Sequence, residues 1–163
     1  MFAPIKLTVR ITEDGQGAGF RLLHRRLTGF GKRRMLQAMG LRFREITRQN
    51  FGMAGIDRPT PWAPYARNYP KWGKRKGGPA TLIRTGRLMQ EIYINSNSSE
   101  YVEVGSDKVY AAAQQFGRAA ARLPARPYFP IVGTGTSYRL TPYSERELGR
   151  VAVREVQRIG MGA

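Results

Sequence analysis

The stretch EIYINSNSSEYVEVG, residues 91–105, contains two short runs in which apolar and polar residues alternate. The runs EIYIN, residues 91–95, and YVEVG, residues 101–105, have the two-residue period of strands that are buried on one face. The polar residues SNSSE between them are typical of a hairpin connection. We therefore predict an antiparallel pair of strands in this part of the chain.

Helical segments flank this hairpin on both sides. Residues 20–51 carry apolar side chains at helical spacing, with arginine and lysine on the opposite face. Gly29, Gly31 and Gly40 interrupt the pattern, and each costs up to about 1 kcal/mol relative to alanine inside a helix. We expect two helices here, or one helix broken near residues 29–31. Residues 144–160 predict a C-terminal helix, with Ser144 and Glu147 spaced as a capping box.

Shorter elements complete the predicted fold. PIKLTVRI, residues 4–11, alternates as a strand does, and TLIRTGRL, residues 81–88, predicts a short helix capped by Thr85. We expect a second short helix over 109–116, ended by Gly117, then extended chain over 122–132 and a loop or extra hairpin over 133–141. The fold class is α+β, with the N-terminal helix or helix pair and the C-terminal helix packed on a small antiparallel sheet.

Residues 52–80 form a long loop rich in proline, aromatic and basic residues. The prolines exclude a regular helix or a central strand, and a loop of this length is either functional or partly disordered. Basic and aromatic side chains alternate in YARNYPKWGKRKGG, residues 65–78, a composition that suits base stacking and phosphate binding. The favoured alternative is an arm that wraps a neighbouring subunit, with Trp62 and Trp72 as buried anchors.

The composition indicates one soluble domain over residues 1–163. Apolar residues make up 41% of the 163 residues, enough for a packed core. The sequence lacks the run of about 18–20 apolar residues that a membrane span needs, and its start resembles no secretion peptide. It has no cysteine, which excludes disulfides and thiolate metal sites. We expect a protein that is made in the cytoplasm and has no membrane partner.

The charge is strongly positive and unevenly distributed. The chain has 28 lysine and arginine residues against 11 aspartate and glutamate residues, a formal net charge of +17. Residues 20–50 and 58–87 are basic, whereas residues 90–117 carry Glu91, Glu100, Glu103 and Asp107 against Lys108. This distribution suits either self-assembly through complementary faces or contact with nucleic acid.

The sequence offers no convincing catalytic site, metal site or cofactor site. The single histidine, His24, has no carboxylate neighbour in the sequence, so general acid–base chemistry is not indicated. Glu91, Glu100 and Glu103 share the predicted hairpin, but alternation makes Glu103 a solvated strand residue rather than half of a glycosidase pair. The glycine-rich stretches 15–19 and 72–78 match neither phosphate-loop nor dinucleotide spacing. We expect a protein that is not an enzyme and needs no cofactor.

Four segments, in order, resemble the phage virion morphogenesis proteins of the Mu type, which are related to the tail completion proteins of P2-like phages. They are DRPTPWAPY (57–65), TLIRTGRL (81–88), VEVGSDKVYAAAQQFG (102–117) and PARPYF (124–129). The resemblance spans about residues 20–160. Within these segments we expect Tyr110, Phe116 and Phe129 to be core residues.

The resemblance implies a structural protein of the virion, at the neck or the head-proximal end of the tail, that acts stoichiometrically when heads and tails join. Its implied partners are further copies of itself in a cyclic homo-oligomer, connector or neck proteins, and tail proteins. The alternative is a basic nucleic-acid-binding protein in non-specific contact with packaged DNA. The expected interface residues are Trp62, Tyr65, Trp72, Lys74, Arg75, Arg87, Arg126, Arg146, Arg150, Arg154 and Arg158.

Overall fold

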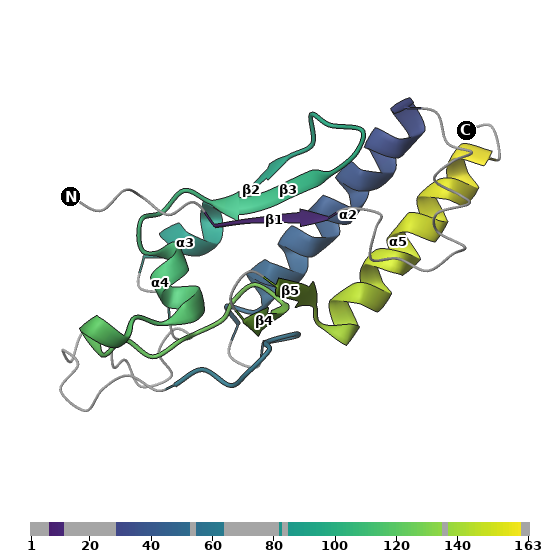
Figure 1. Ribbon diagram of the computed structural model, residues 1–163. Helices are drawn as coiled ribbons and strands as arrows, with labels where there is room; N and C mark the ends of the chain where they lie inside the picture. Colours follow the sequence, from purple (N-terminus) through teal and green to yellow (C-terminus); the bar gives the residue numbers. More distant parts are fainter. Residues whose placement is uncertain are drawn as a thin grey trace. The chain divides into compact units, whose positions relative to one another are not determined.

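The computed structural model describes residues 7–11, 29–52, 55–63, 82, 85–134 and 137–160 (Figure 1). The described elements are β1 (Leu7–Ile11), α2 (Gly29–Gln49), α3 (Arg87–Gln90), β2 (Tyr93–Asn95), β3 (Val102–Ser106), α4 (Ala111–Phe116), a 3-10 turn (Ala119–Ala121), β4 (Ile131–Thr134), β5 (Ser137–Leu140) and α5 (Pro142–Gly160). Helices and antiparallel strands are both present, so the predicted α+β class is confirmed.

The chain forms two compact units, each assembled from segments that are separate in sequence. The helix–sheet unit consists of Thr8–Glu45, Tyr93–Gly105 and Pro142–Ala163. The loop-rich unit consists of Met1–Leu7, Ile46–Ile92 and Ser106–Thr141. The single domain over residues 1–163 stays a prediction, and each unit is described by itself below.

A three-stranded sheet forms one layer of the helix–sheet unit, with β3 between β1 and β2. The predicted hairpin is confirmed: β2 and β3 are antiparallel, with Tyr93 opposite Gly105 and Asn95 opposite Glu103. Val102 and Val104 are fully buried, as strand alternation predicts for the inner face of β3. The strand predicted over residues 4–11 is observed from Leu7, and residues 4–6 lie outside the described residues.

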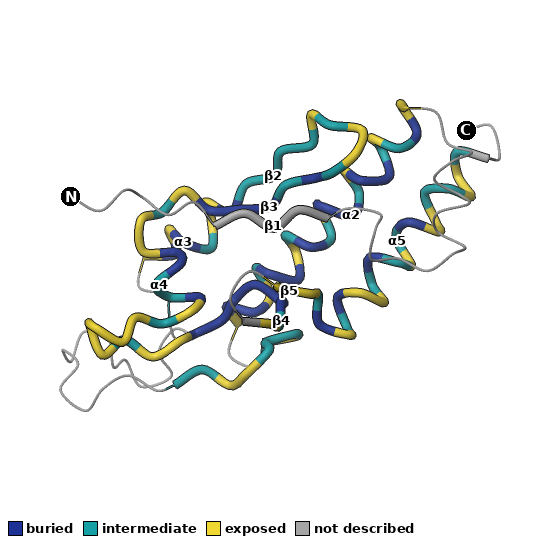
Figure 2. Tube along the Cα trace, in the orientation of Figure 1, coloured by how far each residue is buried: buried dark blue, intermediate teal, exposed yellow. Residues whose placement is uncertain are grey.

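Helix α2 packs its apolar face against this sheet. Met35, Leu36, Met39 and Phe43, which share one face in the sequence, are buried, and so is Ile46 in the loop-rich unit. Buried stretches recur along the helix in Figure 2. Helix α2 begins at Gly29, within the stretch where a break was expected, and is continuous through Gly31 and Gly40. The start of the predicted helical segment, residues 20–28, lies outside the described residues.

Gly40 lies where the helix backbone comes closest to the sheet. A Cβ atom at this position would lie 2.6 Å from Cγ2 of Val102 and 3.4 Å from Cγ2 of Ile94. The glycine therefore costs helix propensity but allows α2 to approach the strands closely. Its role is packing against the sheet rather than interruption of the helix.

Helix α5 runs antiparallel to α2 (Figure 1), and its residues Leu148 and Ala152 are buried. Arg42 Nη2 contacts Glu147 Oε2 at 2.6 Å, and Arg34 Nε lies 3.4 Å from Glu155 Oε2. The hydrogen bond from Arg42 is the main cause that lowers the pKa of the Glu147 carboxyl, and the same bond raises the pKa of Arg42. The two ion pairs link the helices along their length.

The predicted capping box of α5 is wrong. The helix begins at Pro142, so Ser144 lies inside its first turn, where it is buried. Proline is favoured at the first helical position because it has no N–H to leave unpaired. Glu147 is therefore too far along to cap the helix, and its carboxylate binds Arg42 and Arg150 instead.

The loop-rich unit contains only short elements. Helix α3 begins after Gly86, which has a φ of 70° and serves as the N-cap without a side-chain hydrogen bond, so the prediction that Thr85 caps this helix is wrong. Helix α4 ends at Gly117, as predicted. Strands β4 and β5 pair as an antiparallel hairpin, which confirms the second of the two predicted alternatives for this region.

Candidate functional site

The buried side-chain amide of Asn50 holds three stretches of the loop-rich unit together. Its Nδ2 donates to the carbonyls of Asp57 and Tyr128, at 3.0 Å each. Its Oδ1 accepts hydrogen bonds from the backbone N–H groups of Ile56, at 3.1 Å, and Asp57, at 2.8 Å. Asn50 follows directly on α2, so the end of this helix is tied to residues 55–58 and to the chain at residue 128.

The side-chain amide of Gln115, on α4, also binds the backbone of this segment, at residues 128 and 129. Its Oε1 accepts from the backbone N–H groups of Tyr128 and Phe129, each at 2.9 Å, and its Nε2 donates to the Phe129 carbonyl at 3.3 Å. Tyr128 and Phe129 are both fully buried. Because this segment pairs with no described strand, the two amides satisfy backbone groups that regular secondary structure does not pair there.

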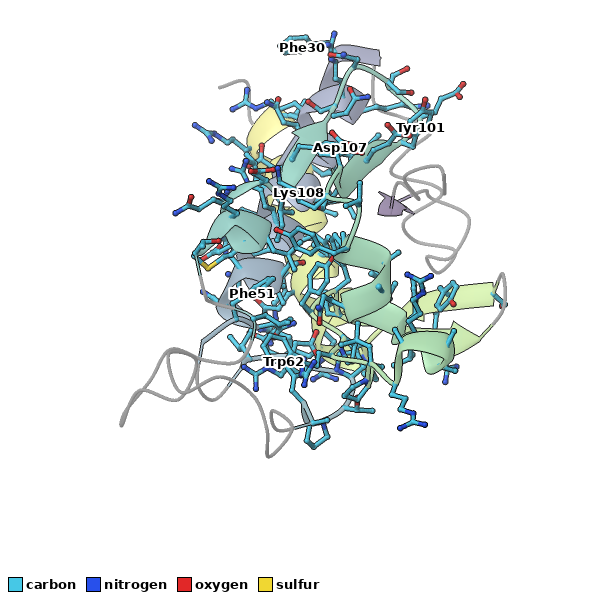
Figure 3. The ribbon with its side chains drawn as sticks, turned by 90° about the vertical axis from the view of Figure 1, so that its left-hand side faces the viewer. Phe30, Phe51, Trp62, Tyr101, Asp107 and Lys108 are labelled. Atoms are coloured by element: carbon cyan, nitrogen blue, oxygen red, sulfur yellow. The ribbon has the colours of Figure 1, made fainter. Side chains whose placement is uncertain are left out.

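An aromatic cluster fills the space between these segments. The ring centroids of Phe51 and Tyr128 are 5.3 Å apart, and those of Tyr128 and Phe129 are 4.9 Å apart. Trp62 meets Phe51 edge to face, with centroids 5.8 Å apart (Figure 3). Burial raises the pKa of the Tyr128 hydroxyl above its ordinary range, so this residue is a neutral core side chain.

Trp62 is held at the margin of the cluster by polar contacts. Its Nε1 donates to the Pro127 carbonyl at 2.7 Å, and the guanidinium carbon of Arg58 lies 3.9 Å from the centre of its ring. Arg58 also donates from Nε to the Asn50 carbonyl at 2.7 Å, and its partial burial lowers its pKa. The indole expected to anchor a neighbouring subunit is therefore half-buried against its own chain.

Arg126 is likewise engaged inside the loop-rich unit. Its side chain is buried, with 5% of the residue exposed, and its Nε donates to the Ala63 carbonyl at 3.0 Å. Gly117 allows this stretch to turn back on α4, because its φ is 76° and a Cβ would lie 2.9 Å from the Ala125 nitrogen. The family-like segment 124–129 thus has a clear structural role.

Apolar side chains are exposed at both ends of α4. Val109 is 71% exposed, Tyr110 40%, Phe116 44% and Tyr138, on β5, 42%. The rings of Phe116 and Tyr138 lie against each other with centroids 5.4 Å apart. The expectation that Tyr110 and Phe116 are core residues is therefore wrong, whereas Phe129 is buried as predicted. We call the contacting pair Phe116 and Tyr138 the α4 apolar surface.

Every fourth residue along one side of α5 is an exposed arginine: Arg146, Arg150, Arg154 and Arg158. Only Arg150 has an ion pair with a described residue, at 2.7 Å from Glu147 Oε1. We call this set the arginine row. Arg87, the first residue of α3, is also exposed, in the loop-rich unit.

The other predicted site residues cannot be placed. Tyr65, Trp72, Lys74 and Arg75 lie outside the described residues, as does His24. Among the described residues, no three histidine, cysteine, aspartate or glutamate side chains gather as metal ligands would. In the same residues no helix is both long and apolar enough to cross a membrane.

Sequence reasoning missed the structural importance of Asn50 and Gln115. A lone polar residue beside a helical apolar pattern gives no local signal, because its partners are distant in sequence. It also misassigned Phe116, since an aromatic residue at the end of a helix is more often core than surface. A signal was present for the arginine row, whose regular spacing is visible in the sequence.

These observations define a small, basic α+β protein with an exposed apolar surface at α4 and an exposed row of arginines on α5. Residues 20–148 match the phage virion morphogenesis family. The chain belongs to this family, and its role is a structural one in the assembly of the phage virion. No curated protein and no solved structure shows a significant match to the chain.

Proposed function

We propose that this protein completes phage tails or joins tails to heads, as a stoichiometric, non-enzymatic component of an oligomeric ring at the neck of the particle. Membership of the phage virion morphogenesis family carries this proposal. The neck position follows from the likeness of the segments 57–65, 81–88, 102–117 and 124–129 to proteins of tail completion. Its partners are then further copies of itself and proteins of the connector and tail.

The α4 apolar surface supports an assembly role. Large apolar side chains that lie against each other in water typically mark contacts with other proteins. Phe116 and Tyr138 already contact each other, so they present a pre-ordered aromatic pair to a partner. Aromatic residues are enriched at the energetic centres of protein interfaces.

Electron microscopy of lysates made without this reading frame tests the position of action. The expected result is full heads that accumulate apart from unattached or overlong tails. Complementation with the intact gene restores joined particles. Normal, infectious particles in the absence of the protein would contradict the proposal.

Complementation with surface variants then tests the α4 apolar surface. We expect Phe116→Gln with Tyr138→Gln to give unjoined heads and tails, and to reduce the oligomeric mass of the purified protein in solution. The control is Leu41→Gln with Ile56→Gln, which removes apolar side chains of similar exposure elsewhere, 46% and 44%. Equal behaviour of the two double variants would rule out α4 as the contact surface.

A further inference from the structure

The arginine row has the geometry of a surface that receives a linear anion. Successive arginines are four residues apart on α5, which places them about 6 Å apart along the helix, at 1.5 Å per residue. The whole row, Arg146 to Arg158, then extends about 18 Å. All four side chains are exposed, and the helical repeat places them on the side of α5 away from the buried residues Leu148 and Ala152.

Among the residues that the structure describes, the partners of this row neutralise only part of its charge. Glu147 is shared between Arg42 and Arg150, and Glu155 is paired with Arg34 of α2. Among the described residues, Arg146, Arg154 and Arg158 make neither an ion pair nor a side-chain hydrogen bond. Attraction to the negative end of the helix dipole accounts for Arg158 alone, because the effect is limited to the last turn.

We propose that the arginine row binds the sugar–phosphate backbone of duplex DNA, without reading its sequence. Duplex DNA carries one negative charge for about every 1.7 Å of its axis, so the length of the row faces several phosphates. Every cation in the row is arginine, whose planar guanidinium matches the geometry of phosphate oxygens better than the ammonium of lysine does. Contacts to the backbone position a protein on DNA but carry no sequence information.

The composition of this face favours DNA over an acidic protein. Protein interfaces have an apolar or aromatic centre from which water is excluded. Among the four arginines the exposed apolar residue is Val153, and no aromatic side chain is present beyond Tyr143 at the start of the helix. The binding of DNA by this row does not depend on the proposed ring or on the position at the neck.

The test measures the affinity of the purified full-length protein for a fluorescently labelled mixed-sequence duplex, by anisotropy, between 50 and 200 mM salt. The variant Arg146→Gln, Arg154→Gln, Arg158→Gln removes the three unpaired arginines and retains Arg150, which is paired with Glu147. The control Arg87→Gln, Arg122→Gln, Arg139→Gln removes the same charge from exposed positions in the loop-rich unit. Circular dichroism and thermal unfolding confirm that both variants fold.

We expect the α5 variant to bind at least tenfold more weakly at 50 mM salt. The slope of log Kobs against log salt should become shallower by about 0.9 for each lost phosphate contact, about 2.7 for three. The control should retain the slope of the unmodified protein. Equal losses in both variants would assign binding to net charge alone and overturn the proposal, as would an unchanged slope in the α5 variant.

Competition distinguishes DNA from an acidic protein as the partner. Unlabelled duplex should displace the labelled duplex from the unmodified protein at a far lower concentration of negative charge than polyglutamate does. The α5 variant should lose most of this preference. Displacement by polyglutamate at an equal concentration of charge would identify the row as a site for acidic polypeptides and overturn the assignment to DNA.

Discussion

The helix–sheet unit and the loop-rich unit are stabilised in different ways. The first buries periodic apolar faces, those of α2, β3 and α5, against one another. The second has few regular elements, and two buried side-chain amides, Asn50 and Gln115, satisfy the backbone of a segment that no strand pairs. Regular secondary structure satisfies its own backbone groups, whereas an irregular segment in the interior needs side chains to do so. The two units should therefore respond differently to the same kinds of mutation.

The largest effect is expected for Asn50→Ala in the loop-rich unit. The change leaves the carbonyls of Asp57 and Tyr128 and the N–H groups of Ile56 and Asp57 without their partner. Each unsatisfied buried group costs about 1–3 kcal/mol, with some recovery through water, so the free energy of unfolding should fall by about 4 kcal/mol.

Urea unfolding followed by circular dichroism measures this loss. The control is Gln37→Ala, an exposed amide on α2, which should change stability by less than about 0.5 kcal/mol. A loss of less than about 1 kcal/mol for Asn50→Ala would show that the loop-rich unit does not depend on this amide.

Gly40→Ala tests the close packing of the helix–sheet unit. Alanine improves helix propensity by about 1 kcal/mol, but overpacking of a core costs about 1–3 kcal/mol. The added Cβ would meet the stiff, fully buried side chain of Val102 at 2.6 Å. We expect a net loss of stability of about 1 kcal/mol, measured by urea unfolding.

Gly149→Ala is the matched control on α5. No atom lies within 4 Å of a Cβ built at Gly149, so the gain in helix propensity of about 1 kcal/mol should appear undiminished. Adding Val102→Ala to Gly40→Ala should relieve the clash in the double variant. Stabilisation by Gly40→Ala alone would mean that α2 and the sheet adjust freely.

A smaller effect is expected for Trp62→Phe. The phenylalanine ring can still pack against Phe51, but the Pro127 carbonyl loses the hydrogen bond from the indole N–H. The expected loss is about 1 kcal/mol, measured by chemical unfolding. Tyr138→Phe, on an exposed ring, should be neutral by comparison. If Trp62→Phe were also neutral, the indole would be free for a partner rather than committed to its own chain.

The smallest effect concerns acid stability. The pKa of Glu147 in the folded protein is lowered below 4.5, chiefly by the hydrogen bond from Arg42. This contribution to stability is fully present above pH 4.5 and is lost as pH falls through the folded pKa. Glu147→Gln should therefore lower stability at neutral pH and flatten the decline below pH 4.5. Thermal unfolding from pH 3 to pH 7 measures both.

Helices and strands in which apolar residues recur regularly were predictable from the sequence. The core face of α2 and the hairpin β2–β3 required only local spacing, because burial of one face imposes the period of the element. The start of α5 was not predictable in the same way. The expected capping box does not form because Glu147 binds two arginines instead. One of them, Arg42, is more than a hundred residues away in sequence.

The candidate surfaces also differ in whether local sequence spacing predicts them. The arginine row was visible in the sequence because helical spacing alone places its members on one side of α5. Trp62 and Arg126 were expected at an interface, yet they contact Pro127 and Ala63 within the loop-rich unit. The exposure of Phe116 beside Tyr138 depends on where the β4–β5 hairpin folds back, which no local pattern encodes.

The sequence by itself therefore determined the α+β class, the apolar faces, the basic charge and the resemblance to phage virion morphogenesis proteins. Each of these depends on residue type and on spacing over one or two turns of a helix or along one strand. Only the tertiary structure decided which polar side chains are buried as hydrogen-bonding partners and which aromatic side chains remain in water. Those outcomes depend on contacts between residues far apart in the chain, such as Asn50 with Tyr128 and Arg42 with Glu147.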